Sequence, residues 1–196
     1  MKSIAVTGGL GSGKSAVLNI FYQLGANTLS ADDIAKHLLQ VNPELRKSIK
    51  ETFGEACYLD DELQAHILAK QAFATPEKQK TLNALIHPLL KTYLHKYISA
   101  TKVVPGILMV EAAILLEAGF EDLFDRVLLI TADKDVRIRR AVRAGYLTEE
   151  DIIRRISLQM PEEEKRSRAD NVIENNGSEA ELFAACSDFW QMINND

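Results

Sequence analysis

Short runs of apolar residues alternate along the chain with longer segments whose apolar positions recur every three or four residues. An apolar run of about four to eight residues, bounded by Gly, Asp or Asn, is typical of a strand buried on both faces of a sheet. Five such runs predict parallel strands at Ser3–Thr7, Ala26–Leu29, Ile107–Val110, Val127–Thr131 and Asn171–Ile173. Strands that alternate with helices predict a three-layer α/β/α fold around a five-stranded parallel sheet.

Helical periodicity and helix start signals lie between these runs. Helices are expected at Lys14–Leu24, Asp133–Ala144 and Thr148–Met160, and helix starts at Asn42-Pro43 and Thr75-Pro76. Gly25 suits the end of the first helix, and Thr148 suits the N-cap of the third.

The segment from Asp33 to Thr101 has helical pattern and no convincing strand. A crossover between parallel strands needs only about a dozen residues, so most of this segment is expected to be an insertion. We interpret residues 33–100 as a helical lobe that binds an acceptor, because ligands of open α/β sheets bind beyond the carboxyl ends of the strands. The alternative is a set of helices that only pack on the sheet. Residues 1–32 and 101–196 form the predicted core domain.

Composition excludes several classes of protein. With 46 % hydrophobic and 26 % charged residues, the chain resembles an ordinary globular protein. Cys57 and Cys186 form neither a metal-ligand cluster nor a disulfide framework, which indicates a reduced, cytoplasmic setting. The N-terminus lacks the apolar run of a signal peptide, and the most apolar stretch, Ile107–Phe120, carries two glutamates. We therefore expect no membrane association.

The net charge of −5 argues against binding to a nucleic-acid backbone, but the positive charge is unevenly placed. Eight of the ten arginines lie between Arg137 and Arg168, a segment with nine cations and six acids. This concentration suits the few charges of a small phosphate ligand better than a polyanion.

Gly8–Ser15 (GGLGSGKS) fits the pattern GxxxxGK[ST], placed between a predicted strand and a predicted helix. The backbone N–H groups of such a loop, together with the helix N-terminus, cradle nucleotide phosphates. The expected nucleotide-binding residues are Gly11, Ser12, Gly13, Lys14, Ser15 and Ala16. Lys14 can reach the β- and γ-phosphates of ATP, and the Ser15 hydroxyl can ligate Mg²⁺.

Two carboxylates follow predicted strands. Asp32, at the end of the second, could accept a proton from an acceptor hydroxyl, and the alternative is that Asp32 or Asp33 caps the next helix. Asp33 is expected to be a cap or a solvent residue. Glu111 ends a buried strand, where desolvation is costly, and is a candidate for the metal site. Glu117 is expected to face solvent or a basic neighbour.

Arg139 and Arg143 lie one helical turn apart, ahead of Gly145. Because guanidinium groups bind phosphate bidentately, we interpret residues 137–168 as a lid in which at least two arginines contact phosphate. The alternative is a solvated face paired with Glu149, Glu150 and Asp151, and most of the eight arginines are expected at the surface. His87, before Pro88 in the inserted lobe, is either a packed residue or a substrate contact.

These parts favour a small-molecule kinase. The Asn-Lys-x-Asp base reader of GTPases is absent from the sequence, and motors and helicases are usually larger. Two alternatives stay open, which are a kinase of another small acceptor, such as a nucleotide or a sugar, and a non-catalytic nucleotide switch.

Motifs in the right order make the chain resemble, nearly end to end, the dephospho-coenzyme A kinase family. The matching segments are Val6–Ser15, Ser30-Ala31-Asp32 with Ile34-Ala35, Ile86-His87-Pro88, Glu111–Glu117, Arg139, Arg143-Ala144-Gly145, Arg155-Ile156, Gln159 and Arg168–Gly177. The chain departs from the family pattern at Ser30, Glu111, Ala113 and Ala144, and none of these changes removes a group that the chemistry needs.

The resemblance implies ATP-dependent phosphorylation of the ribose 3′-hydroxyl of dephospho-coenzyme A, the last step of coenzyme A synthesis. Asp32 would orient or deprotonate that hydroxyl, and Arg139 and Arg143 would close over the γ-phosphate. Asn175 and Asn176 would lie near the adenine, and His87 in the lobe that holds the coenzyme A portion. The expected ligands are ATP, Mg²⁺ and dephospho-coenzyme A, with no nucleic-acid partner. A monomer is expected, with an oligomer left open.

Overall fold

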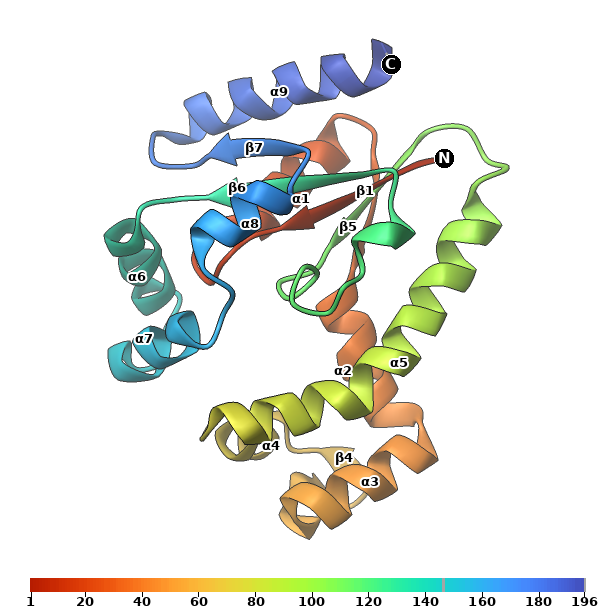
Figure 1. Cartoon of the computed structure of the whole chain (residues 1–196), viewed down its shortest axis with the longest axis vertical. Helices are drawn as coiled ribbons and strands as arrows, with labels where there is room; N and C mark the ends of the chain where they lie inside the picture. The colour runs from red at the N-terminus through yellow and green to blue at the C-terminus, as the bar shows by residue number, and fades with distance from the viewer. Residues whose placement is uncertain (146, 196) are drawn as a thin grey trace. The chain divides into compact units, whose positions relative to one another are not determined.

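The computed structural model describes residues 1–145 and 147–195, and the chain in it divides into two compact units (Figure 1). The larger unit comprises Met1–Ser30 and Ile98–Asp196, and the smaller comprises Ala31–Tyr97. The boundaries differ by two and three residues from those expected at 32/33 and 100/101, so that Asp32 belongs to the smaller unit. Within the expected lid of 137–168, position 146 lies outside the described residues.

A five-stranded sheet with every neighbouring pair parallel forms the larger unit, and its strand order is β2-β5-β1-β6-β7. The strands are β1 (Lys2–Thr7), β2 (Asn27–Ser30), β5 (Ile107–Glu111), β6 (Arg126–Thr131) and β7 (Asn171–Glu174). All five predicted strands are confirmed, each within one residue at either end. The central strand, β1, pairs with β5 on one side and β6 on the other, so that the loop after it opens in the middle of the sheet.

Helices α1 (Lys14–Gln23) and α9 (Glu179–Asn195) pack together over one face of the sheet, and α8 (Glu162–Arg168) lies against β6 on the other (Figure 1). On the first face, Phe21 of α1 meets the ring of Phe189 edge to face, with 5.7 Å between centroids. Both rings are buried with Ile4 and Val6 of β1 in the core of this unit. Each such side chain stabilises the fold by about 1.5–3 kcal/mol, which gives the phosphate-loop strand a rigid base.

Two further helices, α6 (Lys134–Arg143) and α7 (Glu149–Ser157), follow β6. The Thr148 cap is confirmed, because its side chain accepts a hydrogen bond from the N–H of Asp151. The expectation that this helix runs to Met160 is wrong, since α7 ends at Ser157 and α8 begins as a separate helix at Glu162. The break has a local cause, because Pro161 disfavours helical backbone at the residue before it.

The smaller unit holds the helices α2 (Ala31–Val41), α3 (Pro43–Phe53), α4 (Ala65–Ala72) and most of α5 (Pro76–Thr101). The predicted starts at Asn42-Pro43 and Thr75-Pro76 are confirmed, since Asn42 Oδ1 accepts from Leu45 N at 2.9 Å and Thr75 Oγ1 from Lys78 N at 3.3 Å.

The expectation of no strand between Asp33 and Thr101 is wrong. β3 (Tyr58–Leu59) and β4 (Glu62–Leu63) form a small antiparallel hairpin. Its turn is Asp60-Asp61, with φ of 47° and 65°, the left-handed pair of a tight two-residue hairpin turn. Strands of two residues are too short to show the alternation that predicts a strand.

A buried ion pair joins the loop after β5 to α8. Lys165 Nζ lies 2.9 Å from Glu117 Oε1, and the Lys165 side chain is 1 % exposed. The basic neighbour expected for Glu117 is therefore confirmed. The same carboxylate oxygen accepts the N–H of Met160 at 3.1 Å, which fixes the segment that leads into α8.

We expect Lys165→Met to lower the free energy of unfolding by about 3–5 kcal/mol, because it leaves the Glu117 carboxylate in a poorly solvated site without its cation. Urea unfolding measures this quantity. The matched control is Arg166→Ala, which breaks the exposed Arg166–Glu174 pair and is expected to cost less than about 1 kcal/mol. Equal losses in the two variants would contradict a special role for the buried pair.

Among the described residues, no helix is both long and apolar enough to cross a membrane.

Candidate active site

The glycine-rich loop Gly8–Gly13 connects the central strand to α1, as the sequence predicts. Gly13 is the N-cap of α1 and has φ 95° and ψ 22°, a left-handed conformation that an L side chain would strain. Ser12, beside it, is 1 % exposed, and its hydroxyl has no hydrogen-bond partner within the described part of the chain. A buried donor next to a helix N-terminus is suited to an anionic ligand, since both favour negative charge.

Lys14 opens α1 and is only 9 % exposed. Its Nζ donates to the carbonyl oxygen of Gly9 at 3.4 Å, so the ammonium group is held over the loop that precedes it. This position leaves the positive charge beside the N–H groups of the loop. The loop and Lys14 therefore offer two kinds of group to phosphate, backbone donors and a full positive charge.

Ser15 and Glu111, the predicted metal residues, lie together in the larger unit. The Ser15 hydroxyl is 3.3 Å from Glu111 Oε1 and 3.5 Å from Oε2. Glu111 ends β5, and Ser30 of β2 lies opposite it in the parallel register. A hydroxyl and a carboxylate are hard oxygen donors, the type that Mg²⁺ prefers when substrate phosphates complete its shell. Among the described residues, no cluster of three or more His, Cys, Asp or Glu could bind a metal by itself.

Asp32 and Asp33 lie in the first turn of α2, because the helix begins at Ala31. Negative charge in the first turn favours the positive end of the helix, and the alternative that one of them caps the helix stays a prediction. Asp33 is paired with Lys36 at 2.9 Å and its side chain is 72 % exposed, which confirms the solvent position expected for it. Asp32 is also exposed, two residues beyond the end of β2.

The lid arginines divide into two groups. Arg139 and Arg143, the two expected to contact phosphate, are exposed on α6 and line a shallow hollow of about 200 Å³ with Val136 and Arg140. Neither has a hydrogen bond or ion pair to another described residue, so both guanidinium groups are available to a ligand.

The other arginines of the segment have partners. Arg154 pairs with Asp151, Arg166 with Glu174 and Arg168 with Glu121. Of these, the Arg154–Asp151 pair is one that the alternative of a solvated, paired face predicts. The expectation that most of the eight are at the surface is confirmed, because four are exposed, three are partly exposed and Arg137 is buried. Burial lowers the pKa of Arg155, which is half-buried, and Asp151 partly offsets this effect.

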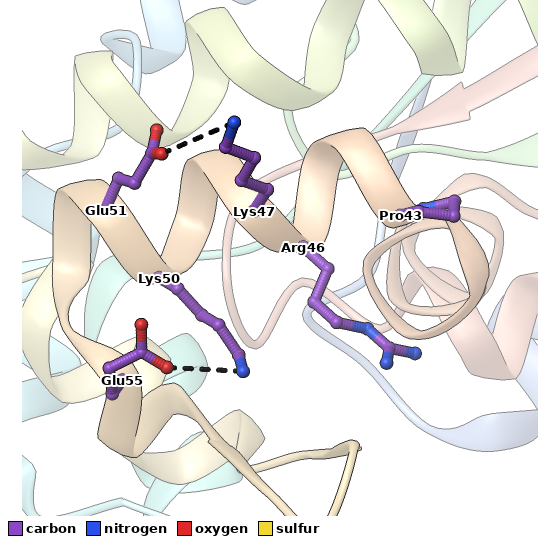
Figure 2. A pocket seen from close by; sticks show the side chains of 6 residues that line it. All are labelled: Pro43, Arg46, Lys47, Lys50, Glu51 and Glu55. Atoms are coloured by element: carbon purple, nitrogen blue, oxygen red, sulfur yellow. Dashed lines mark ion pairs between the residues drawn. The ribbon is translucent and has the colours of Figure 1, made fainter.

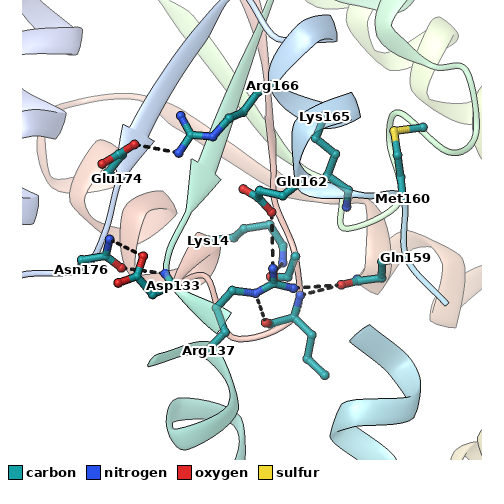
Figure 3. Close-up of polar contacts among 12 residues, drawn as sticks. Lys14, Asp133, Arg137, Gln159, Met160, Glu162, Lys165, Arg166, Glu174 and Asn176 are labelled. Carbon is teal, nitrogen blue, oxygen red and sulfur yellow. Dashed lines mark hydrogen bonds and ion pairs between the residues drawn. The ribbon is translucent and has the colours of Figure 1, made fainter. Parts of the chain in front are cut away.

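Asn175 is buried, and its side chain is bonded to the phosphate loop. Its Nδ2 donates to the carbonyl oxygen of Ser12 at 2.9 Å, and its main-chain oxygen accepts from Arg140 Nη1 at 2.8 Å. Asn176 instead exchanges hydrogen bonds with Asp133, at the start of α6 (Figure 3). Both asparagines therefore connect the end of β7 to neighbouring elements, and their expected proximity to adenine stays a prediction.

His87 lies half-buried on α5, one residue before Pro88, which α5 accommodates inside the helix. Its expected role as a substrate contact stays a prediction.

The smaller unit also contains a hollow of about 380 Å³ on α3, lined by Pro43, Arg46, Lys47, Lys50, Glu51 and Glu55 (Figure 2). Each of its cations has an acidic partner, because Lys47 pairs with Glu51, Lys50 with Glu55 and Arg46 with Asp61. Paired charges leave little attraction for an anion, so we assign no ligand to this hollow.

Sequence reasoning missed two residues that hold the phosphate loop, Arg137 and Gln159, and the contact of Arg140 with Asn175. Arg137 Nε donates to the carbonyl oxygen of Leu10, and Gln159 Oε1 accepts the N–H of the same residue. No spacing rule separates these contacts from surface positions, because the partners lie more than a hundred residues apart in the chain.

Comparison with known proteins gives a consistent result. The family model described as dephospho-CoA kinase matches residues 2–181. The chain is 34 % identical over 193 residues to the dephospho-CoA kinase of Corynebacterium diphtheriae, and the match covers 97 % of this chain and 96 % of that protein.

Two solved structures have the same fold over nearly the whole chain. TT1252 from Thermus thermophilus has a TM-score of 0.80 and 30 % identity, covering 97 % of this chain and 96 % of that one. A dephospho-CoA kinase from Campylobacter jejuni has a TM-score of 0.72 and 28 % identity, covering 98 % of both chains.

Proposed function

Because this chain belongs to the dephospho-CoA kinase family, we propose that it transfers the γ-phosphoryl group of ATP to the ribose 3′-hydroxyl of dephospho-coenzyme A. The products are coenzyme A and ADP, and the reaction is the last step of coenzyme A biosynthesis. The observation that carries the proposal is the phosphate loop with Lys14 held over it. The loop provides the phosphate-binding site of this chain. The identity of the acceptor is inferred from the family to which the chain belongs.

In this proposal the loop N–H groups from Gly11 to Ala16 bind the phosphates, with Lys14 on the β- and γ-phosphates. Ser15 and Glu111 are the residues that would hold Mg²⁺, and their oxygen atoms fit that ion. When bound, the ion neutralises charge on the β- and γ-phosphates. Ser12, with its buried hydroxyl, would donate to the same phosphates.

Asp32 takes the proton of the acceptor hydroxyl or orients it. Its support is its place in the chain, two residues after the carboxyl end of β2, because ligands of open α/β sheets bind beyond the carboxyl ends of the strands. The carboxylate of Asp32 is exposed and can therefore reach a bound acceptor. His87 and the rest of the smaller unit, within the expected lobe of 33–100, would contact the acceptor.

Arg139 and Arg143 bind the γ-phosphoryl group as it is transferred. A guanidinium group stabilises charge spread over three equatorial oxygens. Closure of residues 137–168 over the nucleotide would also exclude water that could hydrolyse ATP. Asn175 supports the loop from behind, through its bond to Ser12.

We expect Arg139→Ala to lower kcat by at least about tenfold while changing the Kd for ATP less, because the arginine acts mainly on charge that develops during transfer. Steady-state kinetics and calorimetric titration of ATP measure the two quantities. Arg154→Ala, which removes an exposed arginine paired with Asp151, is the matched control. An unchanged kcat in Arg139→Ala would show that Arg139 is a surface residue with no role in phosphoryl transfer.

An acceptor panel in a coupled ADP-release assay tests the function. We expect release to depend on dephospho-coenzyme A and to stay at background with other nucleotides and with sugars. Faster release with another acceptor would identify a kinase of that compound. ATP binding without release under any acceptor would identify a nucleotide switch.

The proposed setting is the cytoplasm, where ATP is available. Cys57 and Cys186 are both buried free thiols, as a reduced compartment requires. Burial raises the pKa of Cys186 to about 11, so this thiol stays protonated and unreactive at neutral pH.

A further inference from the structure

Arg137 is the only buried arginine of the eight in the 137–168 segment, with 7 % of its surface exposed. Its Nε donates to the carbonyl oxygen of Leu10 at 3.0 Å. The other two nitrogens of the guanidinium group lie 3.4 Å from Glu162 Oε2 and 3.4 Å from Gln159 Oε1 (Figure 3). A buried guanidinium group needs such partners, and here they come from the phosphate loop, from α8 and from the segment before α8.

Gln159 completes the arrangement from the other side. Its Oε1 accepts the N–H of Leu10 at 2.9 Å as well as the contact from Arg137. Both backbone polar groups of Leu10 are therefore held by side chains from outside the loop. Leu10 lies between Gly9 and Gly11, so these bonds fix the first half of the loop.

Arg137 also explains two glycines of the loop. A Cβ atom at Gly9 would collide with the guanidinium group of Arg137, and one at Gly11 would collide with the main-chain carbonyl of Arg137. The close approach of α6 to the loop is thus possible only because these two residues lack a side chain. Burial lowers the pKa of Arg137 and Glu162 partly offsets this effect, but an arginine remains protonated at neutral pH.

We propose that Arg137 is a positioning residue for the nucleotide, which acts by holding Leu10 and thereby keeps the phosphate loop in its binding conformation. A loop that is ordered before binding has less conformational freedom to lose when the phosphates arrive, which increases affinity. The proposal rests on the proposed function only in taking ATP as the ligand. It also connects α6, the helix of Arg139 and Arg143, to nucleotide affinity.

The test is the Kd for MgATP, measured by calorimetry without acceptor, beside the thermal midpoint of each variant. We expect Arg137→Gln to bind ATP about tenfold more weakly, the size of effect found for the loss of an outer positioning partner. Arg137→Lys keeps the charge near Glu162 but lacks the planar fork, so we expect it to regain thermal stability without regaining affinity. An unchanged Kd in folded Arg137→Gln, or full affinity in Arg137→Lys, would overturn the proposal.

Gln159→Leu provides a second route, because it removes the acceptor of the Leu10 N–H from a different element. Its expected loss of affinity is again about tenfold. The double variant with Arg137→Gln is expected to lose less than the product of the two single losses, since both act on Leu10. Independent, multiplying losses would contradict action through one residue. The matched control is Arg166→Ala, which is expected to keep the affinity of the original chain.

Chemical rescue of ATP affinity by added guanidinium distinguishes a positioning role of the Arg137 guanidinium group from a merely structural role. Arg137, Gly9, Gln159 and Lys165 line a hollow of about 270 Å³ that opens to solvent, through which a small cation can enter. We expect millimolar guanidinium, far below denaturing concentrations, to restore ATP affinity in Arg137→Ala. No rescue in a folded Arg137→Ala variant that has lost affinity would count against the proposal. If the unmodified chain binds ATP but transfers nothing to dephospho-coenzyme A, the proposed function fails and this inference stands.

Discussion

Lys14→Ala is expected to reduce kcat by about 10³-fold or more with every acceptor, the range found when a charge or donor on the transferring group is removed. Lys14 is nearly buried and lies over the loop through its contact with Gly9, so its charge acts in a poorly solvated site. The alanine variant keeps the loop N–H groups. ATP binding should therefore weaken without being lost, while transfer nearly stops.

The measurement is ADP release at saturating dephospho-coenzyme A, with ATP affinity determined by calorimetry on the same samples. Lys47→Ala is the control, because Lys47 is exposed and its ion pair with Glu51 is long, at 3.9 Å. It is expected to keep the kcat of the original chain. If the kcat of Lys14→Ala stays within a few-fold of the original, the proposal that the phosphate loop and Lys14 carry the transfer step is contradicted.

Asp32→Asn is expected to lower kcat by about 10²–10⁴-fold, the usual contribution of a positioned acid–base group. The amide retains the size of the side chain but cannot take the proton of the acceptor hydroxyl. Because Asp32 acts on the acceptor, the Kd for ATP should stay unchanged. Single-turnover transfer and calorimetric titration of ATP measure the two effects separately.

The adjacent carboxylate offers a closely matched control. Asp33→Asn changes the same chemical group one residue away, in the same helical turn, where the side chain is paired with Lys36. We expect kcat to be unchanged in this variant. If Asp32→Asn keeps full turnover, Asp32 is not the activator, and if both variants lose turnover alike, the effect belongs to α2 as a whole.

The architecture followed from the sequence where a signal was local. The three inner strands of the large sheet, β1, β5 and β6, are mainly apolar runs. The helices that begin at Pro43 and Glu149 are preceded by side chains that cap them. The hairpin at Tyr58–Leu63 was missed because its strands are too short to alternate. The break before α8 was missed although Pro161 signals it.

The phosphate loop was equally clear, because glycines, a lysine and a serine at fixed spacing have one common use. The roles of the arginines were not clear from the sequence. Spacing on one helix face singled out Arg139 and Arg143, whereas the structure places Arg137 and Arg140 against the loop and its supporting Asn175. Only the fold brings β1, α6 and the segment before α8 together, so no local pattern could assign those contacts.

The central claim is transfer to one hydroxyl of one acceptor, and the most direct test is the structure of the product. The chain is incubated with MgATP and dephospho-coenzyme A, and the new phosphate is located by mass spectrometry and phosphorus NMR. We expect one added phosphate, on the ribose 3′-oxygen, formed in equal amount with ADP and absent with Lys14→Ala. An unchanged acceptor, or a phosphate on any other oxygen, would contradict the account.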